Sequence, residues 1–198
     1  MKKITLLLIS LFSFYTLSAQ IEYKFGLKGG VHYSGFSDDG SFVLADSFGF
    51  QLGLISEITI SNKFSLQPEL LYSERKGQDG TKPGDSRSYF FVSERSYIDL
   101  PIGVKYSFSD KFHIELGPQL SFLTSDKNTI TPYSTNSNPD SELIVNDIDF
   151  SANLGFGYSP TEKIIMQLRL NYGFSKVVET FDVKNSMVSL GIGYWIFE

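Results

Sequence analysis

Eight stretches of the chain alternate apolar and polar residues with a period of two, which is typical of β-strands that have one apolar face. Each apolar face holds five or six residues. The strands are therefore about ten residues long, as tilted strands that cross a bilayer need, whereas strands of soluble sheets typically have about 5–6. The predicted strands cover residues 24–33, 48–60, 64–73, 98–106, 112–122, 147–158, 164–175 and 188–197.

The links between these strands alternate in length. Short links fall at 61–63, 109–111 and 159–163, and long links at 35–47, 74–96, 124–146 and 176–186. Short periplasmic turns that alternate with long outer loops are typical of transmembrane barrels. The pattern predicts that the mature N-terminus is periplasmic and that every long link is an outer loop. The longest links are rich in Ser, Thr, Asn, Asp, Gly and Pro, which suits hydrated loops.

The two faces of each predicted strand differ sharply, because one is aliphatic and aromatic while the other carries glycine, amides and charges. The alternation alone also fits a soluble barrel with an apolar interior. However, the interior of an eight-stranded barrel is just wide enough for side chains, and these large apolar residues would overfill it. We therefore predict an all-β, eight-stranded antiparallel up-and-down transmembrane β-barrel, closed by pairing of its first and last strands.

Aromatic residues gather near the strand ends, which predicts two girdles at the membrane interfaces. The group toward the long links contains Tyr33, Phe48, Phe50, Tyr72, Phe122, Phe150, Tyr172 and Phe174. The group toward the short links contains Phe64, Tyr106, Phe112, Tyr158 and Tyr194, with Ile60 beside them.

Charged residues on the polar face must lie in the lumen if the apolar face meets lipid. They are expected to form ion pairs, because a charge in a narrow protein interior is tolerated only when it is paired or hydrated. We interpret the set as a structural plug rather than an ion path. The residues are Lys28, Glu57, Glu69, Lys105, Glu115 and Arg169.

The first residues have the order of a secretory signal peptide. Lys2 and Lys3 precede an apolar run, and Leu17-Ser18-Ala19 supplies a small residue before the expected cleavage site. The apolar run is shorter than the ~20 residues of a membrane-spanning helix. We predict a cleaved signal peptide at 1–19 and an outer-membrane β-barrel domain at 20–198.

Charge and cysteine content exclude several classes of function. Loss of Lys2 and Lys3 with the signal peptide changes the formal net charge from −5 to −7, which disfavours nucleic-acid binding. The chain has no cysteine, so disulfides, thiolate metal sites and a lipid-modified cysteine are excluded.

Two segments resemble the outer-membrane β-barrel domain family that includes the PorT-like proteins of Bacteroidetes. They are Leu66–Ser73, with its Gln-Pro-Glu sequence, and Tyr97–Tyr106, with its Pro-x-x-x-Lys sequence; Leu116-Gly117-Pro118 and the Leu17–Gln20 junction fit as well. The resemblance covers roughly residues 21–198 and implies the barrel fold and the outer membrane. It says little about activity, although PorT itself is associated with protein secretion.

Candidate chemistry is sparse. His32 and Ser34 share a face but are too far apart along a strand for the direct contact that general-base catalysis needs, and His113 lies at the opposite end of the barrel. Asp38-Asp39 and Asp147-x-Asp149 are read as loop charge and interior filling rather than as calcium sites. Gly26-x-x-Gly29-Gly30 is followed by no helix, so it is not a phosphate loop. We predict a protein that is not an enzyme and needs no cofactor or metal.

Two hypotheses for function remain. The first is a structural or interaction barrel, whose outer loops bind an extracellular partner or whose barrel associates with other membrane proteins. The second is a transport component, either a narrow pore or an accessory of secretion. The expected partners are outer-membrane lipid and lipopolysaccharide, together with the barrel-assembly machinery. That machinery reads a C-terminal pattern matched here by Ser189-x-Gly191-x-x-Tyr194-x-Ile196.

Overall fold

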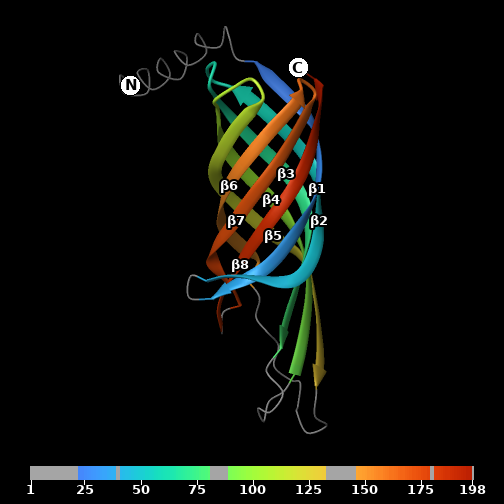
Figure 1. Ribbon diagram of the computed structural model, residues 1–198. Coiled ribbons are helices and arrows are strands. Elements are labelled where there is room, and N and C mark those ends of the chain that lie inside the picture. Colours follow the sequence, from blue (N-terminus) through green and yellow to red (C-terminus); the bar gives the residue numbers. More distant parts are fainter. Residues whose placement is uncertain (1–21, 39–40, 81–88, 133–145, 179–180, 198) are drawn as a thin grey trace, which may run out of the picture.

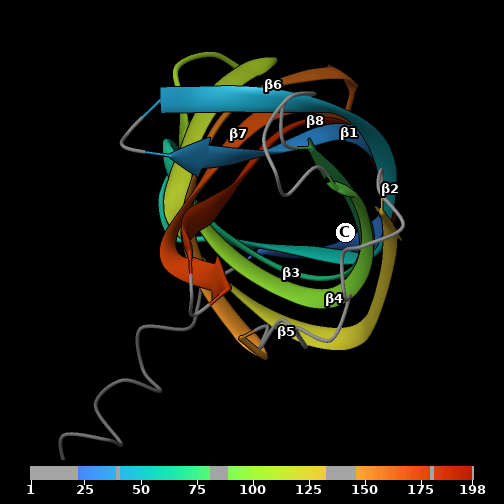
Figure 2. The same ribbon diagram turned by 90° about the horizontal axis from the view of Figure 1, so that it is seen from below.

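The computed structural model describes residues 22–38, 41–80, 89–132, 146–178 and 181–197, and these form one closed antiparallel barrel of eight strands in sequence order. Figures 1 and 2 show the cylinder from the side and from one end. Strand β8 pairs with β1, which confirms the predicted closure. The strands are β1 (Tyr23–Asp38), β2 (Ser41–Thr59), β3 (Phe64–Gly80), β4 (Tyr89–Ser107), β5 (Phe112–Pro132), β6 (Ile148–Thr161), β7 (Ile164–Val178) and β8 (Phe181–Phe197).

The predicted signal peptide and its cleavage site lie outside the described residues, as does Asp39. Within the described ranges, no helix has the length and apolar character to span a membrane.

Three tight turns join β2 to β3, β4 to β5 and β6 to β7 at the same end of the barrel as the last residues of β8 (Figure 1). In each turn a serine or threonine hydroxyl accepts a hydrogen bond from the backbone N–H three residues later, which explains why such residues favour these positions. The pairs are Ser61 with Phe64 at 3.2 Å, Ser109 with Phe112 at 3.1 Å, and Thr161 with Ile164 at 3.2 Å.

The strands continue far into the segments that the sequence pattern assigned to long loops, so those loop boundaries were wrong. Strand β3 runs on to Gly80, β4 starts at Tyr89 and β5 reaches Pro132. Beyond Glu74 and Phe122 the ladders join only these three strands, apart from one backbone hydrogen bond from Leu123 N–H to the Asp147 carbonyl at 2.8 Å. The three strands project past the barrel body (Figure 1). We call residues 75–80, 89–96 and 123–132 the strand extension. The period-2 pattern fades there because neither face of a projecting sheet has to be apolar.

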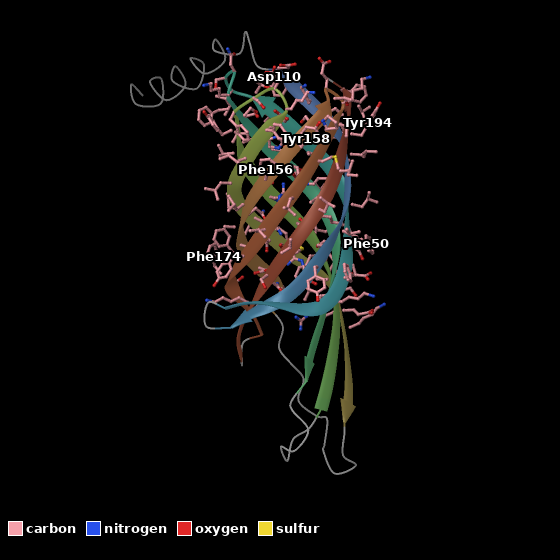
Figure 3. All side chains as sticks on the ribbon, in the orientation of Figure 1. Phe50, Asp110, Phe156, Tyr158, Phe174 and Tyr194 are labelled. Atoms are coloured by element: carbon pink, nitrogen blue, oxygen red, sulfur yellow. The ribbon has the colours of Figure 1, made fainter. Side chains whose placement is uncertain are left out.

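Inside the barrel body, side chains alternate between the outer surface and the lumen as predicted. Outward aliphatic and aromatic side chains are typically 40–60% exposed, for example Leu168 at 49%, whereas their polar neighbours are almost fully buried. The aromatic residues form girdles at both ends, with Phe50 and Phe174 toward the strand extension and Tyr158 and Tyr194 toward the tight turns (Figure 3). The faces therefore match a barrel that meets lipid with its outer wall.

Candidate functional site in the barrel lumen

Four charged side chains meet near the middle of the lumen. Both carboxylate oxygens of Glu69 accept hydrogen bonds from Lys28 Nζ at 3.0 Å, and they also accept bonds from the two terminal nitrogens of Arg169 at 3.0 and 2.7 Å. Arg169 Nε donates to Glu115 at 2.6 Å. All four residues are at most 5% exposed. We call Lys28, Glu69, Glu115 and Arg169 the central ion cluster.

Two glutamines complete the hydrogen bonding of the carboxylates. Gln67 Nε2 donates to Glu69 at 2.7 Å and to Glu115 at 3.2 Å, and Gln167 Nε2 donates to Glu115 at 2.8 Å. Neutral amides satisfy carboxylate oxygens without adding charge. The central ion cluster is therefore well supplied with donors, which a buried ion pair requires.

Every member of this set comes from an odd-numbered strand, namely β1, β3, β5 or β7. Glycines of the even-numbered strands face them across the register, as Gly155 faces Glu115 and Gly191 faces Gln167. A Cβ atom on Gly155 would come within 2.5 Å of Glu115 Cγ. The large side chains of odd strands therefore fill the space that glycines on even strands leave free.

A separate pair lies closer to the tight turns. Lys105 Nζ pairs with Glu57, whose other oxygen accepts a hydrogen bond from Ser65 at 2.9 Å. An apolar group of Ile55, Ile165 and Trp195 also points into the lumen. The alternation placed Trp195 inward but did not assign the two isoleucines, because apolar residues at lumen positions break the expected pattern.

A second ion cluster, formed by Arg75, Asp99 and Asp149, fills the lumen where the strand extension begins. We call it the outer ion cluster; the sequence pattern did not predict it. Arg75 donates to Asp99 at 2.6 Å, lies 3.4 Å from Asp149, and has its guanidinium carbon 4.4 Å from the centre of the Tyr97 ring. Asn185 donates to Asp149 at 2.7 Å. Asp99 and Asp149 were placed on polar faces, but Arg75 lay in a predicted loop.

The six charged residues chosen from the sequence thus lie in two groups: Lys28, Glu69, Glu115 and Arg169 meet in the middle, while Glu57 and Lys105 meet near the turns. Between the central and outer clusters, an amide and hydroxyl layer crosses the lumen. It contains Gln119, Ser121, Ser151, Asn153 and Asn171, linked by bonds of 2.8–3.0 Å.

The buried charges balance. Among the Lys, Arg, Asp and Glu side chains that the structure describes as buried, five are cations and five are carboxylates. Such balance matters because an unpaired charge in a protein interior costs several kcal/mol. The arrangement can hold strands together across the lumen and block it.

The remaining candidate residues are engaged elsewhere. His32 Nε2 lies 3.2 Å from the Phe50 carbonyl, and Ser34 Oγ donates to the Lys76 carbonyl at 2.9 Å. Asp149 belongs to the outer ion cluster. Among the described residues, no three His, Cys, Asp or Glu side chains are placed to hold a metal ion.

Comparison with solved structures shows which known barrels this fold resembles. No curated protein matches the chain significantly. Among solved structures, Ail, the attachment invasion locus protein of Yersinia pestis, is 15% identical with a TM-score of 0.51, over 88% of this chain and 99% of that one. Neisserial surface protein A is 15% identical with a TM-score of 0.52, over 86% and 96%. At this identity the likeness shows the fold alone.

The sequence profile of the family described as "Outer membrane protein beta-barrel domain" matches residues 18–179, most of the chain. Together with the fold, this match gives the location, which is the outer membrane of a Gram-negative bacterium. The chain therefore belongs to the outer membrane protein beta-barrel domain family.

Proposed function

We propose that this protein is a closed-lumen barrel that acts at the bacterial surface through its strand extension, in a structural or binding role and without enzymatic activity. The mature N-terminus is then periplasmic and the extension extracellular. The filled lumen is the observation that carries the proposal.

The central ion cluster supports a closed lumen because it ties four strands together across the barrel axis. Glu69 of β3 bonds to β1 and β7, and Glu115 of β5 bonds to β7. The outer ion cluster and the amide and hydroxyl layer add further contacts between the central ion cluster and the strand extension. A solute path would require these buried charges to separate in a low-dielectric interior, which costs several kcal/mol for each ion.

The strand extension supports a role at the surface. It carries β3, β4 and β5 past the girdle of aromatic residues (Figures 1 and 3). Lys76 and Glu94 pair across two of its strands at 3.1 Å while each side chain stays 40% or more exposed. Residues at such a site contribute little to holding the barrel closed, and they are accessible to a partner.

Conductance in planar bilayers tests the closed lumen. Purified protein should insert without producing steady current steps, at low and high salt. Reproducible unitary conductance would refute the proposal and favour a narrow pore, the transport alternative. The narrower PorT-like role in secretion rests on the sequence resemblance alone and remains a prediction.

Lipopolysaccharide at the outer wall and the barrel-assembly machinery are the proposed membrane partners. Tyr194 and Ile196 of the C-terminal pattern are 50% and 45% exposed on the outer wall, where a receptor can reach them before insertion. Replacing Gly191 and Tyr194 together should reduce the amount of protein assembled in the membrane. Normal assembly of that variant would refute recognition of this C-terminal pattern by the barrel-assembly machinery.

A further inference from the structure

Three prolines lie on consecutive strands halfway between the two aromatic girdles. Pro68 is in β3, Pro101 in β4 and Pro118 in β5. When the register of the flanking pairs is continued, Pro68 lies opposite Ser56, Pro101 opposite Glu69, and Pro118 opposite Ile102. Proline has no backbone N–H, so it cannot supply a ladder hydrogen bond. We call these three residues the proline seam.

The backbone ladder is interrupted at each of them. Pairing between β2 and β3 stops at Ile55–Glu69 and resumes at Ile58–Leu66. Pairing between β3 and β4 is missing between Leu71–Asp99 and Pro68–Ile102, and pairing between β4 and β5 is missing between Pro101–Gln119 and Val104–Leu116. The interruptions therefore affect three neighbouring ladders at one depth.

The rest of the wall differs. At the same depth, the ladders β1/β2, β1/β8, β5/β6, β6/β7 and β7/β8 run without a gap. One side of the barrel is thus continuously hydrogen-bonded, and the other has lost ladder bonds where no bulk water can replace them, a loss that is costly within a bilayer. One replacement is present, because Ser56 Oγ donates to the Pro68 carbonyl at 3.2 Å.

Side chains in the lumen supply the other connections of this weakened region. Glu69 is bonded to Lys28 on β1 and Arg169 on β7, and Gln67 is bonded to Glu115 on β5. Lys105 on β4 pairs with Glu57 on β2. Strand β3 is therefore held at mid-membrane by contacts across the lumen as well as by its own ladder, and the Lys105–Glu57 pair holds β4 closer to the tight turns.

We propose that residues 66–71 of β3 and 99–104 of β4 form a compliant panel of the barrel wall, and that Glu69 is the latch that keeps this panel closed. The panel opens locally while β6, β7 and β8 stay paired. It is a conformational device that goes beyond the surface role proposed above, and it places the moving part of the barrel in the wall rather than at either mouth.

Amide hydrogen exchange of the full protein in lipid nanodiscs, followed by NMR, tests this inference. Panel amides should exchange at least tenfold faster than amides of residues 153–156 and 167–170, which lie at a similar depth in β6 and β7. A factor of ten corresponds to about one net backbone hydrogen bond. Equal protection in the two regions would overturn the proposal.

Two variants act on the panel in opposite directions. Pro101→Ala restores an N–H opposite the Glu69 carbonyl and should slow panel exchange about tenfold. Pro160→Ala, near the tight turn after β6, is the matched control and should leave panel exchange unchanged. Slowing that is equal in both variants, or absent in Pro101→Ala, would contradict the role of the seam.

Glu69→Gln should accelerate amide exchange in the panel more than tenfold and leave exchange in β6 and β7 unchanged. Asp149→Asn, at a buried carboxylate outside the panel, is the control and should leave exchange in the panel unchanged. If Glu69→Gln fails to assemble, Gln67→Leu removes a neutral tie and keeps every charge. It should then produce a smaller acceleration confined to the same panel. Uniform acceleration around the barrel would show that Glu69 serves general stability and is no latch.

Discussion

Replacing Arg169 with methionine is the most informative single perturbation of the lumen. Arg169 makes three hydrogen bonds of 2.6–3.0 Å to two carboxylates, and the side chains of Arg169, Glu69 and Glu115 are 5%, 0% and 2% exposed. The variant leaves Lys28 as the one cation of the central ion cluster. Breaking a buried ion pair by removing one partner costs about 3–5 kcal/mol, so we expect the free energy of unfolding to fall by about that amount.

A second substitution separates charge imbalance from lost packing. Arg169→Met combined with Glu115→Gln restores a neutral cluster of Lys28 and Glu69. Residues in one hydrogen-bonded network commonly show coupling of about 0.5–3 kcal/mol. The double variant should therefore be about 1–2 kcal/mol more stable than Arg169→Met alone. Lys76→Met, which removes a cation paired at 40% exposure, is the surface control and should cost about 1 kcal/mol or less.

Reversible urea unfolding of the protein in lipid vesicles gives these free energies. Trp195 is the only tryptophan of the chain and is buried beside Ile55 and Ile165, so its fluorescence reports whether the lumen is assembled. A loss below about 1 kcal/mol for Arg169→Met would refute the reasoning. A double variant no more stable than the single one would also contradict it.

The remaining predictions concern lumen filling and the lipid face. Gly155→Ala should destabilise the barrel by about 1–3 kcal/mol through overpacking, because the added Cβ would lie 2.5 Å from the Glu115 side chain. Gly103→Ala should be nearly neutral, because its Cβ would lie 3.6 Å from the same side chain. Equal unfolding free energies for the two variants would contradict this account. Leu168→Arg, on the outer wall at mid-membrane, should cost about 2–4 kcal/mol, and Ile60→Arg near the interface about 0–1 kcal/mol. Vesicle unfolding measures both, and similar losses would contradict the membrane depth assigned to them.

The sequence predicts the membrane part of this fold well, because lipid imposes a strict rule on one face of every strand. From Phe64 to Ser73, or from Phe112 to Phe122, each outward position must be apolar, so the period of two is easy to recognise. Beyond Glu74 and Phe122 both faces of the sheet leave the membrane, and the rule no longer applies. The strand extension was therefore missed, although the β3/β4 ladder runs into it without a break; the β4/β5 ladder enters it through a register shift between Ser96 and Tyr97.

The same limit explains why the contacts inside the lumen were predicted only in part. Lys28, Glu69 and Arg169 sit on regular alternation and were found, but their partner choice across the barrel depends on strand tilt, which no local pattern reveals. Arg75 follows the last recognisable outward position of its strand, so its pairing with Asp99 was not predicted. Ile55 occupies a lumen position with an apolar side chain that the pattern reserved for polar ones.

Around the central ion cluster, large side chains on odd strands and glycines on even strands divide the lumen between them, and this division restricts how the sequence can change there. A residue that gains volume at Gly155 needs a neighbour such as Glu115 to lose some, and a shorter Glu115 would in turn leave Arg169 without an acceptor. Tolerated changes should thus come in compensating pairs across adjacent strands. Opening a hole at the level of the central ion cluster would require shortening side chains of odd strands in sets that leave the net charge unchanged, and no single substitution would suffice.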